Sequence, residues 1–263
     1  MWKVFELYAL ISIVSWGIAM VLLAFRTPIV ARISDALVLL GIISLSFFIV
    51  KLWMYLDRPP LRTLGETRLW YSLFISCIGY VLYKRWNYRL FLAYALLMAL
   101  VFMIINYAKP DIHDKALMPA LQSVWFVPHV IVYIVSYAFL GFSCLLGIIG
   151  LYQVRKGIDT KQVLGIAENI IYIGFGFLTL GLLFGALWAK EAWGHYWTWD
   201  PKETWALLTW GVYIVYMHLS LQNRKSPRYY LWFITLSFTI LLIAWFGINY
   251  LPAAQMSVHV YSN

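Results

Sequence analysis

Long apolar runs dominate this sequence and leave few options for its fold. A helix needs about 20 apolar residues to cross the hydrocarbon core of a bilayer. These runs lack the period-two alternation of the strands in an outer-membrane barrel. We therefore expect an all-α fold, a polytopic membrane bundle of about eight transmembrane helices. The eight candidate spans are residues 5–25, 35–56, 69–84, 88–107, 124–153, 167–190, 204–222 and 229–250.

Composition excludes an ordinary soluble enzyme. Only 12% of the residues are charged, which is about half of the roughly 25% found in soluble globular chains. The segments between the runs hold no more than about twenty residues, so there is no room for a separate soluble domain. Residues 1–263 are expected to form a single membrane domain. The net charge of +9 fits basic loops on the cytoplasmic side and does not predict a nucleic-acid partner.

The distribution of charge over the loops predicts the orientation. The loops after the first, third, fifth and seventh runs hold eleven basic and three acidic residues, and the other side holds nine basic and eight acidic residues. Basic loops stay in the cytoplasm, which places both termini on the outer side. The stretch from Lys51 to Arg68 dissents, because its four basic residues fall on the outer side.

The segment from Trp188 to Trp210 contains six of the 14 tryptophans, and most of it forms the predicted outer loop at residues 188–210. An interfacial aromatic belt is the ordinary explanation, but a belt places only a ring or two at each helix end. Such a dense cluster suits a large flat apolar ligand with a polar edge, because indoles stack and also donate a hydrogen bond. The candidate ligand-contacting residues are Trp193, Gly194, Trp197, Trp199, Asp200 and Trp205.

Part of this segment also has a structural explanation. The order Asp200, Pro201, Lys202, Glu203 predicts a helix start with Asp200 as N-cap and Glu203 as the third residue of a capping box. The same helix N-terminus could attract an anionic group. Both roles stay open for Asp200.

The histidines divide by position along the predicted spans. His129 and His259 fall on the same side as the tryptophan segment, where they are either hydrogen-bonded interfacial residues or the two imidazole ligands of a six-coordinate haem iron. His218 lies inside a span, where an ionisable residue is a functional candidate, although it could also bond a neighbouring helix. His129 aligns with Tyr133 and Tyr137 at four-residue steps on one helix face, which indicates either a pocket lining or core packing.

One further motif predicts packing alone. Gly181 and Gly185 have the GxxxG spacing that favours close contact between helices and carries no chemistry by itself.

The run WGHYWTWDPKETW at residues 193–205 resembles the tryptophan-rich WWD signature of the haem-handling proteins of cytochrome c maturation. Its ending DPKETW is most similar to the CcsA (ResC) family of system II and differs from the related system I proteins. Other stretches agree, and the resemblance runs from about residue 55 to the end. They are Arg58-Pro59-Pro60-Leu61, Thr63-Leu64-Gly65-Glu66, Leu121-Gln122-Ser123-Val124-Trp125 with His129, and Gly247-Ile248-Asn249 leading to His259.

The resemblance implies that the chain handles non-covalent haem in the bacterial cytoplasmic membrane or its thylakoid equivalent. It implies that His129 and His259 are the axial ligands at the outer site, and that His218 ligates haem on the route from the cytoplasmic side. It implies delivery of haem to a Cys-x-x-Cys-His segment of apocytochrome c, where thioether bonds form. His195 stands where many members carry a small residue, so no family role is transferred to it.

The resemblance also implies partners. They are a CcsB-like (ResB-like) membrane protein and apocytochrome c, with thiol-reducing proteins as an open option. The synthase activity is expected only for the pair with CcsB, so the enzyme status of the isolated chain stays open. Two other functions stay open as well: a haem exporter or chaperone without ligation, and a membrane transporter without haem.

Overall fold

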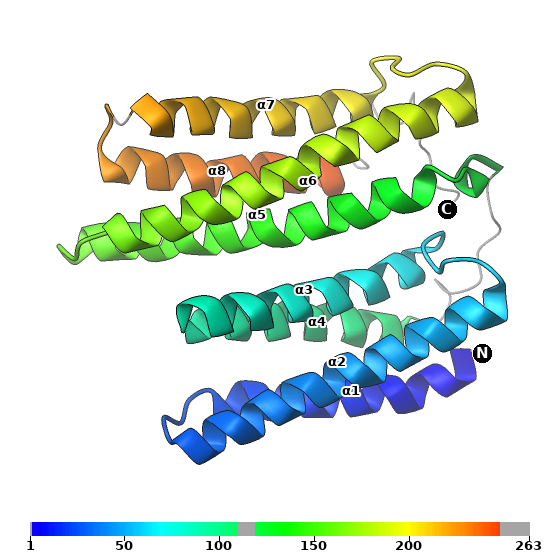
Figure 1. Cartoon of the computed structure of the whole chain (residues 1–263), viewed down its shortest axis with the longest axis horizontal. Helices are drawn as coiled ribbons and strands as arrows, with labels where there is room; N and C mark the ends of the chain where they lie inside the picture. The colour runs from blue at the N-terminus through cyan, green and yellow to red at the C-terminus, as the bar shows by residue number, and fades with distance from the viewer. Residues whose placement is uncertain (1, 110–118, 223, 248–263) are drawn as a thin grey trace. The chain divides into compact units, whose positions relative to one another are not determined.

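The structure is a computed structural model that describes residues 2–109, 119–222 and 224–247 (Figure 1). These residues form α-helices and one short 3₁₀ helix, without strands, which confirms the all-α prediction. The bounds are α1 Trp2–Leu22, α2 Pro28–Leu56, α3 Leu64–Trp86, α4 Arg89–Ala108, η2 Pro119–Gln122, α5 Phe126–Arg155, α6 Lys161–Trp193, α7 Pro201–Gln222 and α8 Pro227–Trp245.

Seven of these helices are long and apolar enough to cross a membrane, which confirms a polytopic helical membrane protein. Among the described helices α3 is the exception, although residues 69–84 were expected to span. It begins earlier than predicted because Thr63 and Glu66 form a capping box in front of it. Charged residues at both of its ends, including Lys84 and Arg85 in the last turn, lower its apolar content.

Contacts divide the chain into two compact units, Met1–Leu117 and Met118–Asn263. The first unit holds α1 to α4 and the second holds η2 and α5 to α8. The single membrane domain at residues 1–263 and the outer location of both termini stay predictions.

In the first unit, α1 packs closely on α2 because a glycine admits a tryptophan. Trp16 is fully buried and its indole Nε1 donates to the carbonyl oxygen of Val38 at 3.2 Å. A Cβ built on Gly41 would lie 2.3 Å from that Nε1 atom, so only glycine fits there. Ser12 adds a buried hydrogen bond of 3.0 Å to the carbonyl oxygen of Gly41.

A buried ion pair organises the loop between α2 and α3. Glu66 is 1% exposed, and its Oε1 and Oε2 atoms accept from the two terminal nitrogens of Arg58 at 2.9 and 3.0 Å. The backbone N–H groups of Arg62 and Thr63 also donate to Oε2. A buried carboxylate requires such partners because desolvation of its charge is costly. Arg58 is one of the four basic residues on the predicted outer side that do not follow the positive-inside rule, and this ion pair gives it a local structural role.

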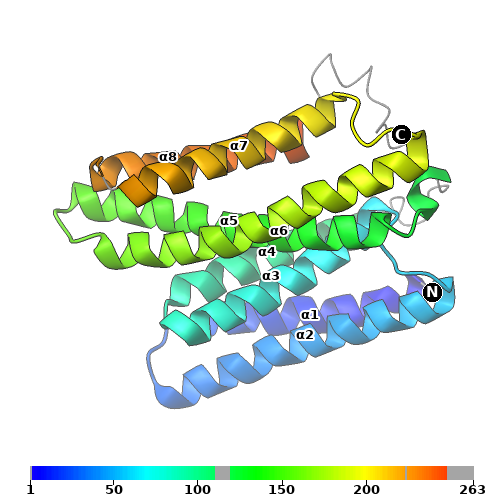
Figure 2. The same ribbon diagram turned by 45° about the horizontal axis from the view of Figure 1, so that its top comes forward.

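In the second unit, α5 packs against both α6 and α8, and α7 packs on α8 (Figure 2). Small residues bring the axes together: a Cβ on Gly150 would lie 2.3 Å from Leu231 Cδ2, and one on Gly147 would lie 2.5 Å from Thr235 Oγ1. Consecutive helices run in opposite directions (Figure 1). The start of α5, the end of α6 and the start of α7 therefore lie at one end of this unit.

Candidate functional site

The tryptophan segment consists of two helix ends and a short loop. Helix α6 runs to Trp193, further than predicted, and α7 already begins at Pro201. The loop proper is therefore residues 194–200, and Trp188, Trp193 and Trp205 stand on helices. Trp188 and Trp205 already fall inside the predicted spans 167–190 and 204–222, so Trp193 is the ring that was expected in the loop and lies on α6 instead.

Gly194 ends α6 in the left-handed conformation, with φ 85°. Its N–H donates to the carbonyl oxygen of Lys190 at 3.1 Å, and the Lys190 ammonium donates back to the Gly194 carbonyl oxygen at 2.8 Å. A Cβ on Gly194 would meet nothing within 4 Å. The backbone conformation, rather than crowding, therefore accounts for glycine here, and ligand contact at Gly194 stays a prediction.

Asp200 is the N-cap of α7, as predicted. It is 6% exposed, and its Oδ1 accepts from the N–H of Lys202 at 2.8 Å. The Glu203 carboxylate completes the box, because its Oε2 accepts from the N–H of Asp200 at 3.2 Å and from the N–H of Thr198 at 2.8 Å. The cap therefore holds both the helix and the loop before it. The attraction of a ligand anion to this helix end stays a prediction.

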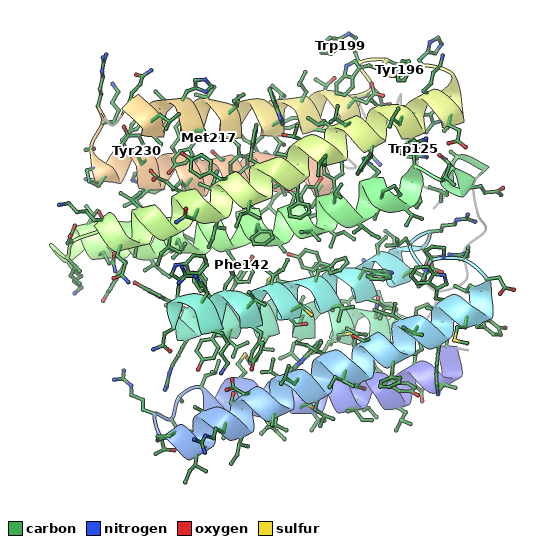
Figure 3. All side chains as sticks on the ribbon, in the orientation of Figure 1. Trp125, Phe142, Tyr196, Trp199, Met217 and Tyr230 are labelled. Atoms are coloured by element: carbon green, nitrogen blue, oxygen red, sulfur yellow. The ribbon has the colours of Figure 1, made fainter. Side chains whose placement is uncertain are left out.

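The loop presents its rings outward. Trp199 is 68% exposed and Tyr196 is also exposed (Figure 3). Trp197 meets Trp199 edge to face, with ring centroids 5.9 Å apart. Trp199 has φ 59°, a left-handed conformation that is rare for a bulky residue. An exposed aromatic side chain on strained backbone is a feature that concentrates at ligand-binding sites.

His129 is held on three sides at the start of α5. Its Nδ1 lies 2.9 Å from the carbonyl oxygen of Gly181 on α6. Its ring stacks on Trp188, with centroids 5.4 Å apart and planes inclined by 27°, and meets Tyr133 edge to face at 4.7 Å. The Trp188 indole is itself fixed, because its Nε1 donates to the carbonyl oxygen of Ala120 at 2.7 Å.

Gly181 and Gly185 of α6 leave the space in which the rings of Tyr133 and His129 pack, and we call these two glycines the His129 seat. A Cβ on Gly185 would lie 2.8 Å from His129 Cε1, and a Cβ on Gly181 would lie 2.4 Å from Tyr133 Cδ1. Larger residues at either position would displace the rings. The sequence predicted close helix packing from this motif, but did not reveal that the motif positions a candidate metal ligand.

The contact with Gly181 also selects the protonation of the His129 ring. A carbonyl oxygen only accepts hydrogen bonds, so Nδ1 carries the proton. In the neutral ring, Nε2 then carries the lone pair that a metal would bind. Histidines that ligate metals commonly donate their other nitrogen to a backbone carbonyl in this way.

The aromatic column continues down α5 and reaches α8. Tyr133 stacks on Tyr137, with centroids 5.4 Å apart, and Tyr137 contacts Trp245 at 4.9 Å. The predicted alignment of His129, Tyr133 and Tyr137 on one face is therefore confirmed as mutual ring packing. The column brings the end of α8, from which the chain leads to His259, against the helix that carries His129.

Two further predicted residues, His218 and Trp205, lie on α7. His218 is exposed on α7 and its Nδ1 lies 2.9 Å from the carbonyl oxygen of Ile214 in the same helix. Trp205 is half-buried near the start of α7. His259 lies outside the described residues, and among the described ones no group of three potential metal-ligating side chains occurs.

Comparison with known proteins identifies relatives over most of the chain. Residues 61–254 match the family described as cytochrome C assembly protein. The chain is similar to proteins named cytochrome c biogenesis protein CcsA: 33% identical to that of Chlamydomonas reinhardtii over 81% of this chain and 65% of the relative. It is 30% identical to that of Piper cenocladum over 91% of each, and 30% identical to that of Guillardia theta over 92% of this chain and 90% of the relative.

The cap on α7 predicts a difference between two substitutions of Asp200. Asp200→Asn keeps an oxygen that accepts from Lys202 N–H, whereas Asp200→Ala removes it and should lower stability by about 1 kcal/mol. We expect a lower apparent melting temperature in detergent for the alanine variant alone. Equal melting temperatures for Ala and wild type would contradict the capping role.

The seat of His129 predicts opposite effects at two glycines of α6. Gly185→Ala forces the His129 ring to move and should destabilise the protein by about 1–3 kcal/mol, as overpacking does. Gly176→Ala is the matched control, because a Cβ there meets nothing within 4 Å and alanine favours the helix. Thermal unfolding in detergent should separate the two. Equal behaviour would show that Gly185 does not constrain His129.

Proposed function

The chain belongs to the CcsA family of cytochrome c biogenesis proteins, and from this premise we propose that it brings haem to the outer membrane face and presents it to apocytochrome c. Membership supports a role in cytochrome c maturation. The proposal for haem presentation rests mainly on one observation. The ring of His129, on α5, packs against α6 with its Nδ1 at the carbonyl oxygen of Gly181, so that Nε2 is the nitrogen that would bind iron.

His129 is the first axial ligand of the proposed site. A half-buried imidazole that is stacked on Trp188 and bonded through Nδ1 loses little freedom when Nε2 binds iron. Such outer-shell bonds fix the tautomer and raise the basicity of the ligand. Trp193, which packs edge to face on Trp188 at 4.8 Å, extends this aromatic surface.

His259 is the second axial ligand. Trp245 contacts Tyr137, which stands eight residues after His129, or about 12 Å along α5. His259 follows Trp245 by fourteen positions, and a chain of fourteen steps spans up to about 46 Å. The length of the tail therefore permits His259 to reach the iron opposite His129.

The loop at residues 194–200 supplies the rim of the site. Half-buried Trp197 and exposed Trp199 contact the porphyrin face or edge, which suits the apolar ring and the polar N–H of each indole. Asp200 and Glu203 hold the loop through the α7 cap. Their contribution is positional, because their carboxylates bond to backbone groups.

His218 serves a second haem site, on the route from the cytoplasmic side. It follows Trp205 by thirteen residues, or roughly 20 Å along α7. Among the seven span-length helices, α7 has the smallest share of buried residues, 17%. Its exposed surface includes the ionisable residue His218. Such a residue is costly against lipid, which favours a partner helix at His218. A CcsB-like protein would supply that helix and the other iron ligand.

The chemistry at the outer site is an addition reaction. Each cysteine thiol of the apocytochrome adds across a haem vinyl group: sulfur bonds to the carbon next to the ring, and the proton ends on the terminal carbon. The substrate histidine replaces one of the two axial ligands. Residues of this chain would accelerate the reaction by holding haem and polypeptide in register.

The ligand assignment predicts the effect of removing each external histidine. His129→Ala and His259→Ala should each lower haem retention and cytochrome c yield, and added imidazole should restore part of both by occupying the vacant position. His195→Ala is the control, because this exposed histidine lies in the same region without an assigned role. Absorption spectra of the purified protein and the cytochrome c yield in cells provide the readouts. Unchanged spectra and full maturation in both variants would refute the site.

The two-site route predicts a different effect at His218. His218→Ala should deplete haem at the outer site by reducing its supply, and the spectrum of the haem that remains should be unchanged. Haem added from the outer side should refill the site. An altered ligand-field spectrum at normal haem occupancy would contradict the separation of the two sites.

A further inference from the structure

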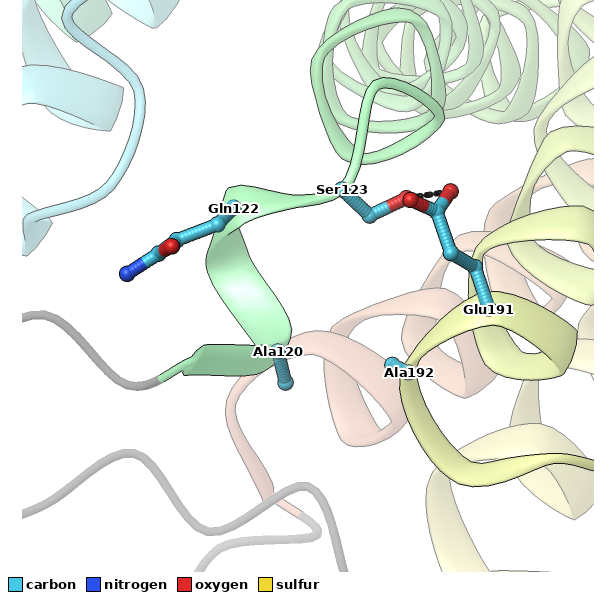
Figure 4. A pocket seen from close by; sticks show the side chains of 5 residues that line it. All are labelled: Ala120, Gln122, Ser123, Glu191 and Ala192. Atoms are coloured by element: carbon cyan, nitrogen blue, oxygen red, sulfur yellow. Dashed lines mark hydrogen bonds between the residues drawn. The ribbon is translucent and has the colours of Figure 1, made fainter.

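A small pocket opens beside the His129 seat, between η2 and the end of α6 (Figure 4). Its volume is about 270 Å³. Two alanines leave this space open, and polar side chains stand at its edge. In the part of the chain that the structure describes, the lining residues are Ala120, Gln122, Ser123, Glu191 and Ala192.

Among the described residues that line the pocket, Glu191 carries the only charge. Ser123 Oγ donates to Glu191 Oε2 at 2.6 Å, which orients the carboxylate along the pocket wall (Figure 4). Within the described parts of the chain, no lysine, arginine or histidine forms an ion pair with Glu191. The neighbouring Lys190 ammonium instead donates to the carbonyl oxygen of Gly194.

The pocket is joined directly to the proposed haem site. The carbonyl oxygen of Ala120, in its wall, accepts from the indole of Trp188, the ring that stacks on His129. Glu191 follows Trp188 by three residues and therefore lies about one turn further along α6. Glu191 and the ring that stacks on His129 thus share the same end of α6.

We propose that this pocket binds a lysine or arginine side chain of the polypeptide that receives haem. The inference rests on the proposed function and adds a docking contact beside the reacting groups. The volume lies below the roughly 300–1,000 Å³ of small-molecule sites, so it suits a side chain better than a cofactor. The carboxylate that Ser123 orients selects a cation.

Binding of synthetic peptides to the haem-loaded full chain tests this proposal. The peptides carry Ser-x-x-Ser-His, so that no thioether forms, a fluorescent label, and one lysine moved through the positions that flank the motif. We expect lysine at one position to raise affinity about fivefold over the neutral peptide, as a partly exposed ion pair does. The gain should shrink at high salt.

Variants of Glu191 test whether this carboxylate causes the rise in peptide affinity. Glu191→Gln keeps an acceptor for Ser123 Oγ and should abolish the lysine gain, while Glu191→Lys should favour a glutamate at the same peptide position. Asp159→Asn, which removes the same charge from an exposed site before the start of α6, should retain the gain. An equal gain in all variants, or none at any position, would overturn the proposal.

The haem spectrum separates this outcome from failure of the proposed function. Normal haem absorption with no lysine gain dependent on Glu191 would refute the pocket assignment alone. A chain that binds no haem, with or without its membrane partner, would refute the haem site itself.

Discussion

The close contact between α5 and α6 is the interaction on which the site depends. Gly181 and Gly185 remove two side chains from α6, and the rings of Tyr133 and His129 occupy the space. Without this approach, the Gly181 carbonyl oxygen could not reach His129 Nδ1 at 2.9 Å. A packing motif of membrane helices thus also selects the tautomer of the imidazole that we propose as an iron ligand.

Backbone hydrogen bonds to carboxylates stabilise the loop ends that precede α3 and α7. Before α3, the Glu66 carboxylate accepts hydrogen bonds from Arg58 and from two backbone N–H groups. Before α7, the Glu203 carboxylate accepts from the N–H groups of Thr198 and Asp200. In both loops the charge serves local structure. The bonds to Glu203 connect the tryptophan-bearing loop to the start of α7.

Sequence patterns predicted the helices and the capping box of α7 well, because apolar run length and cap residues act locally. They predicted the borders of the tryptophan segment less well: α6 continues to Trp193 because an apolar helix extends until a residue such as Gly194 can adopt positive φ. The seat of His129 could not be predicted, since it depends on which faces of α5 and α6 meet. The pocket at Glu191 depends likewise on where η2 folds back. His259 was predicted as a ligand, and that role stays a prediction.

The central claim is that His129 Nε2 binds haem iron together with a second histidine. Pulsed electron paramagnetic resonance of the ferric, haem-loaded chain tests it most directly when the histidines carry ¹⁵N. We expect a low-spin iron coupled to nitrogens of two protein histidines, with one of these couplings lost in His129→Ala. An iron that couples to no protein histidine, or whose couplings are unchanged in His129→Ala, would contradict it.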